Sequence, residues 1–101
     1  MAILSDEAIL SALDLKELEI EPFNRDNLTP NGYDLTIDEV EIPNENKATT
    51  GSLVIYPGKR FAVSTKERIG CGPNVCAQLW LRTSWARKGI ICSFGKIDSG
   101  F

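Results

Sequence analysis

Apolar positions near the start of the chain follow a helical spacing. Ser5, with acidic residues directly after it at positions 6 and 7, is typical of a helix N-cap and first turn. Apolar residues then recur over 9–13, which predicts one short helix ending near Leu15. After it, Leu18 and Ile20 alternate with glutamates, so we expect a small strand that stops at Pro22.

The rest of the chain shows short alternating runs separated by turn residues. Strands are predicted over residues 33–37, 40–42, 53–56, 61–65, 75–81 and 90–94. The apolar parity changes at 38–39, which predicts a bulge or corner. Thr-Pro-Asn-Gly at 29–32 and the segment 70–74 read as turns, Tyr33-Asp34 could belong to the same turn chemistry, and 43–52 reads as a polar loop. Strands at this density after one helix predict a mostly-β barrel or sandwich, with 1–101 as a single domain. Because so small a barrel buries little core, we also expect oligomerisation.

Composition excludes several classes of protein. With 43% hydrophobic and 25% charged residues, the chain is of ordinary globular type. It contains no apolar run long enough for a membrane span and no basic stretch typical of a secretory signal, so we expect a cytoplasmic protein without a membrane partner. Histidine is absent, which excludes imidazole catalysis, and the cysteines at 71, 76 and 92 form no CxxC pair. Zinc nucleobase deaminases are therefore excluded, no metal ligands are expected from the protein, and the thiols are expected to be small, buried, reduced side chains.

Charge is distributed unevenly between the two halves. Residues 1–50 hold 12 acids and 3 bases, whereas residues 51–101 hold 2 acids and 8 bases, which gives −9 and +6. This asymmetry indicates that the second half collects an anion, while the acidic first half disfavours nucleic acid as a partner.

The bases of the second half concentrate in one segment with hydroxyl groups. Arg82, Thr83 and Ser84 stand where a strand meets a predicted helical turn over 84–88, and Arg87 follows one turn later. Hydroxyls, free N–H groups and arginine at such a position can bind phosphate, although Thr83 or Ser84 could equally cap the turn while the bases are solvated. Asp98 is the one acid in the last 34 residues. It could orient water or bind a sugar hydroxyl, or it could form an ion pair or a turn contact.

The same segments resemble the dCTP deaminase branch of the trimeric dUTPase-like superfamily. The resemblance runs in the family's order along essentially the whole chain. An N-terminal block, residues 3–23, resembles the start of the deaminases. The motifs that follow are Leu-Thr-Pro-Asn-Gly-Tyr-Asp-Leu at 28–35, Arg-Thr-Ser-Trp-Ala-Arg-Lys-Gly at 82–89 and Gly-Lys-Ile-Asp-Ser-Gly-Phe at 95–101.

This resemblance implies a homotrimer of distorted β-barrels, each with a short N-terminal helix, whose nucleotide sites are shared between subunits. It implies that the triphosphate is held by Arg82, Thr83, Ser84 and Arg87, with Mg²⁺ bound through the nucleotide and no zinc. Asp98 would lie beside the deoxyribose and, in triphosphatase chemistry, activate water. Phe94 and Gly95 would border the base pocket, with Phe94 at a position that is usually small.

The resemblance leads to three hypotheses for function. The first is deamination of dCTP to dUTP with release of ammonia. The second is hydrolysis of dUTP to dUMP and pyrophosphate, alone or after deamination. The third is a module that binds nucleotide or supports assembly without catalysis. Family members continue beyond the position of Phe101 into a strand whose glutamate serves as the deaminase proton shuttle, so we expect the chain to be truncated on its C-terminal side and an intact protein to be the enzyme.

Overall fold

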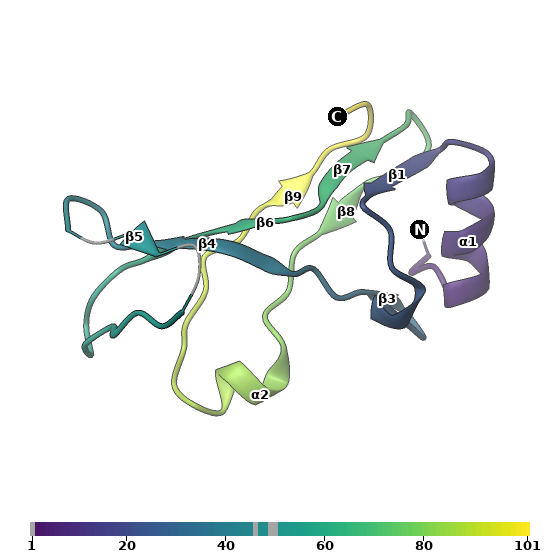
Figure 1. Ribbon diagram of the computed structural model, residues 1–101. Helices are drawn as coiled ribbons and strands as arrows, with labels where there is room; N and C mark the ends of the chain where they lie inside the picture. Colours follow the sequence, from purple (N-terminus) through teal and green to yellow (C-terminus); the bar gives the residue numbers. More distant parts are fainter. Residues whose placement is uncertain (1, 46, 49–50) are drawn as a thin grey trace.

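The computed structural model describes residues 2–45, 47–48 and 51–101 (Figure 1). The helices are α1 (Asp6–Asp14), the 3-10 turn η1 (Arg25–Asn27) and α2 (Thr83–Ala86). The strands are β1 (Leu18–Glu21), β2 (Leu28–Thr29), β3 (Gly32–Tyr33), β4 (Ile37–Glu41), β5 (Lys47–Ala48), β6 (Ala62–Thr65), β7 (Arg68–Cys71), β8 (Ala77–Gln78) and β9 (Lys96–Ile97). The predicted mostly-β character with one short N-terminal helix is confirmed.

Helix α1 and strand β1 form as predicted and pack together at one end of the molecule (Figure 1). The Ser5 hydroxyl accepts a hydrogen bond from the Ala8 N–H at 3.2 Å, which satisfies a donor that the first helical turn leaves free. β1 pairs antiparallel with β7, from Leu18 opposite Cys71 to Glu21 opposite Arg68. The buried side chains here are Ile9, Ala12, Ile20 and Cys71. This small apolar cluster is the main core of the described chain.

A tight hairpin, β2–β3, follows the helix and strand. Thr29 pairs with Gly32 across the predicted Pro-Asn turn. The ring of Tyr33 stacks on Phe23 with a centroid separation of 5.5 Å, and its hydroxyl accepts a hydrogen bond from the Asn24 N–H at 2.9 Å. The Asp6 N–H also donates to the Pro30 carbonyl at 3.0 Å, so the hairpin is tied to the start of α1.

The longest strand, β4, is the centre of a three-stranded sheet in the order β5–β4–β6. Its register with β6 shifts between Ile37 and Glu39, which confirms the predicted bulge at the change of apolar parity. Strand β5 lies inside the segment 43–52 that we predicted to be a loop, so that prediction is wrong for residues 47–48; residues 46, 49 and 50 lie outside the described residues.

Several predicted strands are shorter or absent. Residues 34–36, 53–56 and 90–94 lie within the described ranges and form no strand, and 75–81 contributes only β8, which pairs with β9. Residues 68–71, partly predicted as a turn, form β7 instead. A strand needs a partner for its backbone hydrogen bonds, and β1 supplies one to β7 that the sequence pattern does not reveal.

The strands of the described residues form four small separate sheets and do not close a barrel within the chain. The accessible surface of the chain is 8068 Å², about 2,400 Å² more than the roughly 5,700 Å² typical of a folded monomer of this size. Large apolar side chains contribute to this surface, including Trp80 at 77% and Ile91 at 93% exposure. The isolated chain therefore leaves apolar area uncovered that a stable protein normally buries.

Candidate functional site

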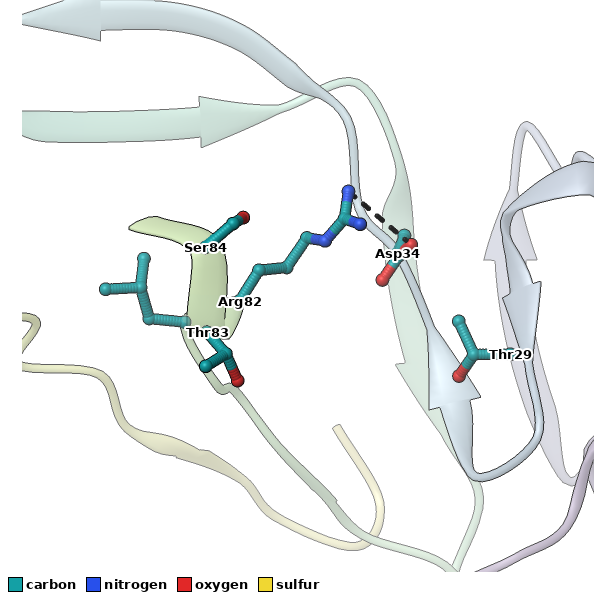
Figure 2. A pocket seen from close by; sticks show the side chains of 6 residues that line it. Thr29, Asp34, Arg82, Thr83 and Ser84 are labelled. Carbon is teal, nitrogen blue, oxygen red and sulfur yellow. Dashed lines mark ion pairs between the residues drawn. The ribbon is translucent and has the colours of Figure 1, made fainter. Parts of the chain in front are cut away.

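An open cleft of about 400 Å³ lies between the β2–β3 hairpin and the start of α2 (Figure 2). One wall holds Thr29 and Asp34, and the other consists of residues 81–84. Two segments about 50 positions apart in the sequence, each part of a motif singled out above, thus meet at one surface. The cleft combines hydroxyls, a guanidinium and a carboxylate, which are groups suited to a polar, charged ligand.

The α2 wall presents hydroxyl groups that the helix does not use for capping. The N-cap residue is Arg82, and no side-chain capping bond is formed there. The N–H groups of Trp85 and Ala86 both donate to the Arg82 carbonyl, at 3.0 and 3.2 Å. The alternative that Thr83 or Ser84 serves as the N-cap is therefore wrong. Both residues stand in the first turn, where helical pairing leaves the N–H groups without a partner.

Helix α2 ends at Ala86, two residues before the limit of the helical turn predicted over 84–88, and its C-cap is Arg87. Gly89 adopts a φ of 90°, a left-handed conformation that glycine reaches without steric cost, and its N–H donates to the Ala86 carbonyl at 3.0 Å. The Lys88 ammonium group lies over the Trp85 ring, 5.0 Å from its centroid. This cation–π contact engages Lys88 with a neighbouring side chain of the same segment.

An ion pair spans the cleft. The guanidinium of Arg82 extends from α2 toward Asp34, with Nη1 3.9 Å from Oδ2 (Figure 2). The Arg82 side chain is 69% exposed and that of Asp34 is 39% exposed. So long and solvated a pair is weak, and it leaves the N–H groups of Arg82 available to an anion that enters the cleft.

The Asp34 wall belongs to a segment without strand structure that is held from two sides. The Asp34 N–H donates to the Asn27 carbonyl at 2.8 Å, and two residues later the Thr36 N–H donates to Oε1 of Glu67 at 2.8 Å. Glu67 is the buried charged residue of the described chain, at 6% exposure. Burial alone would raise the pKa of its carboxyl, but the hydrogen bonds with Thr36 and the charge of Lys66 outweigh it, so the pKa lies below its usual value.

The other predicted site residues do not line this cleft. Arg87 ends α2, and its N–H donates to the Thr83 carbonyl at 2.9 Å. Phe94 is 51% exposed, and the Gly95 carbonyl accepts a hydrogen bond from the Leu79 N–H at 3.4 Å where β8 and β9 meet. Asp98 pairs with Lys96 at 3.1 Å on the surface. The hydrogen bond and charge of Asp98 raise the pKa of Lys96. The roles of these residues in binding or catalysis stay predictions.

Thr29 and Asp34 were not predicted from the sequence to lie at the candidate site, because both were attributed to turn chemistry. The available signal was their position within the motif at 28–35. Pairing of Leu28 with Tyr33 turns the chain back, so that Thr29 and Asp34 both reach the cleft.

The three cysteines do not line the cleft, and all are free thiols. Cys71 is buried as predicted, whereas Cys76 and Cys92 are exposed, so the prediction of buried thiols is wrong for these two. Burial, followed by the charge of Cys76, raises the pKa of Cys71. In the part of the chain that the structure describes, no three histidine, cysteine or acidic side chains lie close enough together to hold a metal ion. No helix in those residues has the length and apolar character required to cross a bilayer.

Comparison with known proteins places these motifs in a family context. No protein-family model matches the chain. Over 89 residues it is 37% identical to the dCTP deaminase of Thermococcus sibiricus, covering 85% of this chain and 57% of that protein. It is 35% identical over 102 aligned positions to the probable deoxyuridine 5'-triphosphate nucleotidohydrolase of Sulfolobus islandicus rod-shaped virus 1, covering 98% of this chain and 65% of the viral protein. The dCTP deaminase of Aeropyrum pernix is 28% identical, and 66% of its length is covered.

These similarities confirm the resemblance predicted from the sequence. The chain is similar to proteins named dCTP deaminase and to a probable deoxyuridine 5'-triphosphate nucleotidohydrolase, at 28–37% identity, which is consistent with the dCTP deaminase and dUTPase-related superfamily. It spans less than two thirds of the length of these relatives.

Proposed function

We propose that this chain is the phosphate-binding part of an enzyme that acts on a deoxynucleoside triphosphate, with deamination of dCTP to dUTP as the reaction. The observation that carries the proposal is the α2 wall of the cleft. There, Thr83 and Ser84 make no capping bond while Arg82 projects over the same opening. Uncommitted hydroxyls, helix N–H groups and a guanidinium are complementary to phosphate oxygens.

A second reaction, hydrolysis of dUTP to dUMP and pyrophosphate, is favoured by the similarity to the viral nucleotidohydrolase, which extends over 98% of the chain. Both reactions require the triphosphate to be bound, and they differ in the group of the nucleotide that is attacked. The deaminase is ranked first because its N-terminal block, residues 3–23, is present and folds into α1 and β1.

We further propose that the working unit is a homotrimer in which the barrel is completed and the site is shared between subunits. The excess surface of about 2,400 Å², rich in apolar side chains, supports a further packing partner. Asp98 and Phe94 do not line the cleft of their own chain and are exposed, which is compatible with contact to a nucleotide held by a neighbouring subunit. The unpaired thiols favour a reducing compartment such as the cytoplasm.

Mg²⁺ fits this site as a cation held mainly by the nucleotide. It favours oxygen ligands and commonly uses one or two carboxylates together with phosphate oxygens. The cleft offers one carboxylate, Asp34, rather than a protein-only cage. When bound with the nucleotide, Mg²⁺ would offset part of the triphosphate charge.

The proposal is tested with the intact protein and dCTP or dUTP in the presence of Mg²⁺. Ammonia release from dCTP identifies the deaminase, and pyrophosphate release from dUTP identifies the triphosphatase. Calorimetry with a non-hydrolysable dUTP analogue adds a measurement that does not depend on turnover. Binding without either product supports the non-catalytic module instead, and the absence of both binding and turnover overturns the proposal. Sedimentation of the same sample measures the oligomeric state separately.

A further inference from the structure

The cleft depends on a short connection whose position is fixed from outside the site. Residues 34–36 link β3 to β4 without joining either strand, yet this segment carries Asp34 on the wall facing Arg82. Backbone outside a sheet has no ladder to hold it, so its position depends on individual hydrogen bonds.

Those hydrogen bonds come largely from the connection between β6 and β7. The Glu67 carboxylate accepts the Thr36 N–H at 2.8 Å, and the Lys66 N–H donates to the Thr36 carbonyl at 2.9 Å. Glu67 is held in turn by the Thr65 hydroxyl, which donates to the Glu67 carbonyl at 2.9 Å. Both backbone groups of Thr36 are thereby fixed by residues about 30 positions later in the chain.

The buried position of the carboxylate makes this arrangement specific. Glu67 is 94% buried, and every buried side-chain polar atom of the described residues has a hydrogen-bond partner. A carboxylate is costly to bury unless it is hydrogen-bonded, so it selects the one backbone conformation that offers the Thr36 N–H. An apolar side chain of the same size would fill the space without fixing that backbone.

We propose that Glu67 is a positioning residue for the phosphate-binding cleft: by holding the Thr36 N–H it places Asp34 opposite Arg82 and so sets the orientation of the guanidinium for the incoming triphosphate. Thr36 is two residues from Asp34, within about 7 Å along the chain, so a shift at one is transmitted to the other. The role of Glu67 in binding rests on the proposed function, whereas its control of the Asp34–Arg82 pair does not.

The first experiment therefore needs no nucleotide. In the intact protein labelled with ¹⁵N, the Arg82 Nε–H resonance reports the neighbourhood of Asp34, and Asp34→Asn provides its unpaired reference. Glu67→Ala is expected to move this resonance toward the Asp34→Asn position. Glu67→Gln keeps a carbonyl acceptor for the Thr36 N–H and is expected to stay close to the wild type. An unchanged resonance in Glu67→Ala would overturn the inference. If that variant does not fold, Glu67→Asp serves in its place, because it keeps the charge but shortens the reach by one methylene.

The second experiment measures dUTP-analogue affinity in a double-mutant cycle with Asp34→Asn. Glu67→Ala is expected to weaken binding by about two- to tenfold in the wild-type background and by less than twofold in the Asp34→Asn background. Equal losses in both backgrounds would show that Glu67 acts on stability alone and would refute its positioning role. If the wild type binds no triphosphate, the proposed function fails, and the resonance experiment still decides whether Glu67 positions Asp34.

Discussion

Replacement of Arg82 by alanine is the most direct perturbation of the cleft. The side chain is 69% exposed and reaches from the N-cap position of α2 to Asp34, so its removal takes away charge without opening a cavity. The ion pair with Asp34 has a separation of 3.9 Å in solvent and contributes about 0 to 1 kcal/mol to folding. We therefore expect the free energy of unfolding of Arg82→Ala to change by less than about 1 kcal/mol.

The effect on binding is larger because phosphate is a better partner than Asp34. A hydrogen bond to a charged group is worth about 1.5 to 3 kcal/mol. The pair with Asp34 is too long for a hydrogen bond, so it orients the guanidinium while leaving its N–H groups available, and nothing is subtracted for giving it up. A loss of about 1.5 to 3 kcal/mol corresponds to an increase in Kd of about 10- to 150-fold.

Calorimetry with the non-hydrolysable dUTP analogue measures this loss, and urea denaturation measures stability in parallel. Arg68→Ala is the matched control, because it removes the same exposed side chain at β7, outside the cleft. Arg82→Lys is expected to fall between wild type and alanine, since lysine keeps the charge without the paired N–H geometry. A change in Kd below twofold for Arg82→Ala, or an equal change for Arg68→Ala, would refute the assignment of the cleft.

Four further outcomes are expected. Arg87→Ala should weaken analogue binding by about tenfold if its guanidinium holds the same triphosphate, and an unchanged Kd would remove Arg87 from the site. Gly72→Ala should lower the free energy of unfolding by about 1 to 3 kcal/mol, because the new Cβ would lie 3.0 Å from the Glu17 carbonyl oxygen; Gly95→Ala, with open space around it, is the control in urea denaturation. A thiol reagent such as Ellman's reagent should modify the exposed Cys76 and Cys92 quickly. It should modify Cys71, which is buried and whose pKa is raised by burial, only on unfolding. Rapid modification of all three thiols in the folded protein would contradict the burial of Cys71. The lowered pKa of Glu67 stabilises the fold above about pH 4.5, the unfolded value, and this contribution is lost as the pH falls through the folded value. Glu67→Gln should therefore flatten the acid limb of the stability–pH curve, and an unchanged limb would show that another group titrates there.

Local signals in the sequence predicted a good part of the fold. Ser5 and the acids after it marked the start of α1, Pro22 marked the end of β1, and the change of apolar parity marked the bulge in β4. Each of these depends on neighbours within a few residues, where side-chain chemistry acts directly on the backbone. The motif at 82–89, which we propose binds phosphate, could be identified from the sequence for the same reason, since its residues are contiguous.

Contacts between distant segments were not predictable in this way. Residues 53–56 and 90–94 have strand-like patterns, yet these described segments form no strand, while the glycine-containing segment 68–71 forms β7 because β1 pairs with it. A hydrophobic pattern reports which face of a strand is apolar, but not whether a partner backbone lies alongside. The same reason explains why no barrel closes within the described residues: the number of strands does not determine which strands pair, and here they form four small separate sheets.

The sequence by itself determined the mostly-β class, the N-terminal helix, the absence of histidine chemistry and the cluster of bases and hydroxyls near residue 82. Only the tertiary structure brought Asp34 to Arg82 and Glu67 to Thr36, across separations of 48 and 31 positions. The first set follows from composition and local periodicity, which each stretch of chain carries independently. The second depends on how segments far apart in the sequence are placed together. The role of a charged side chain in these contacts therefore depends on a partner that its neighbours in the sequence do not indicate.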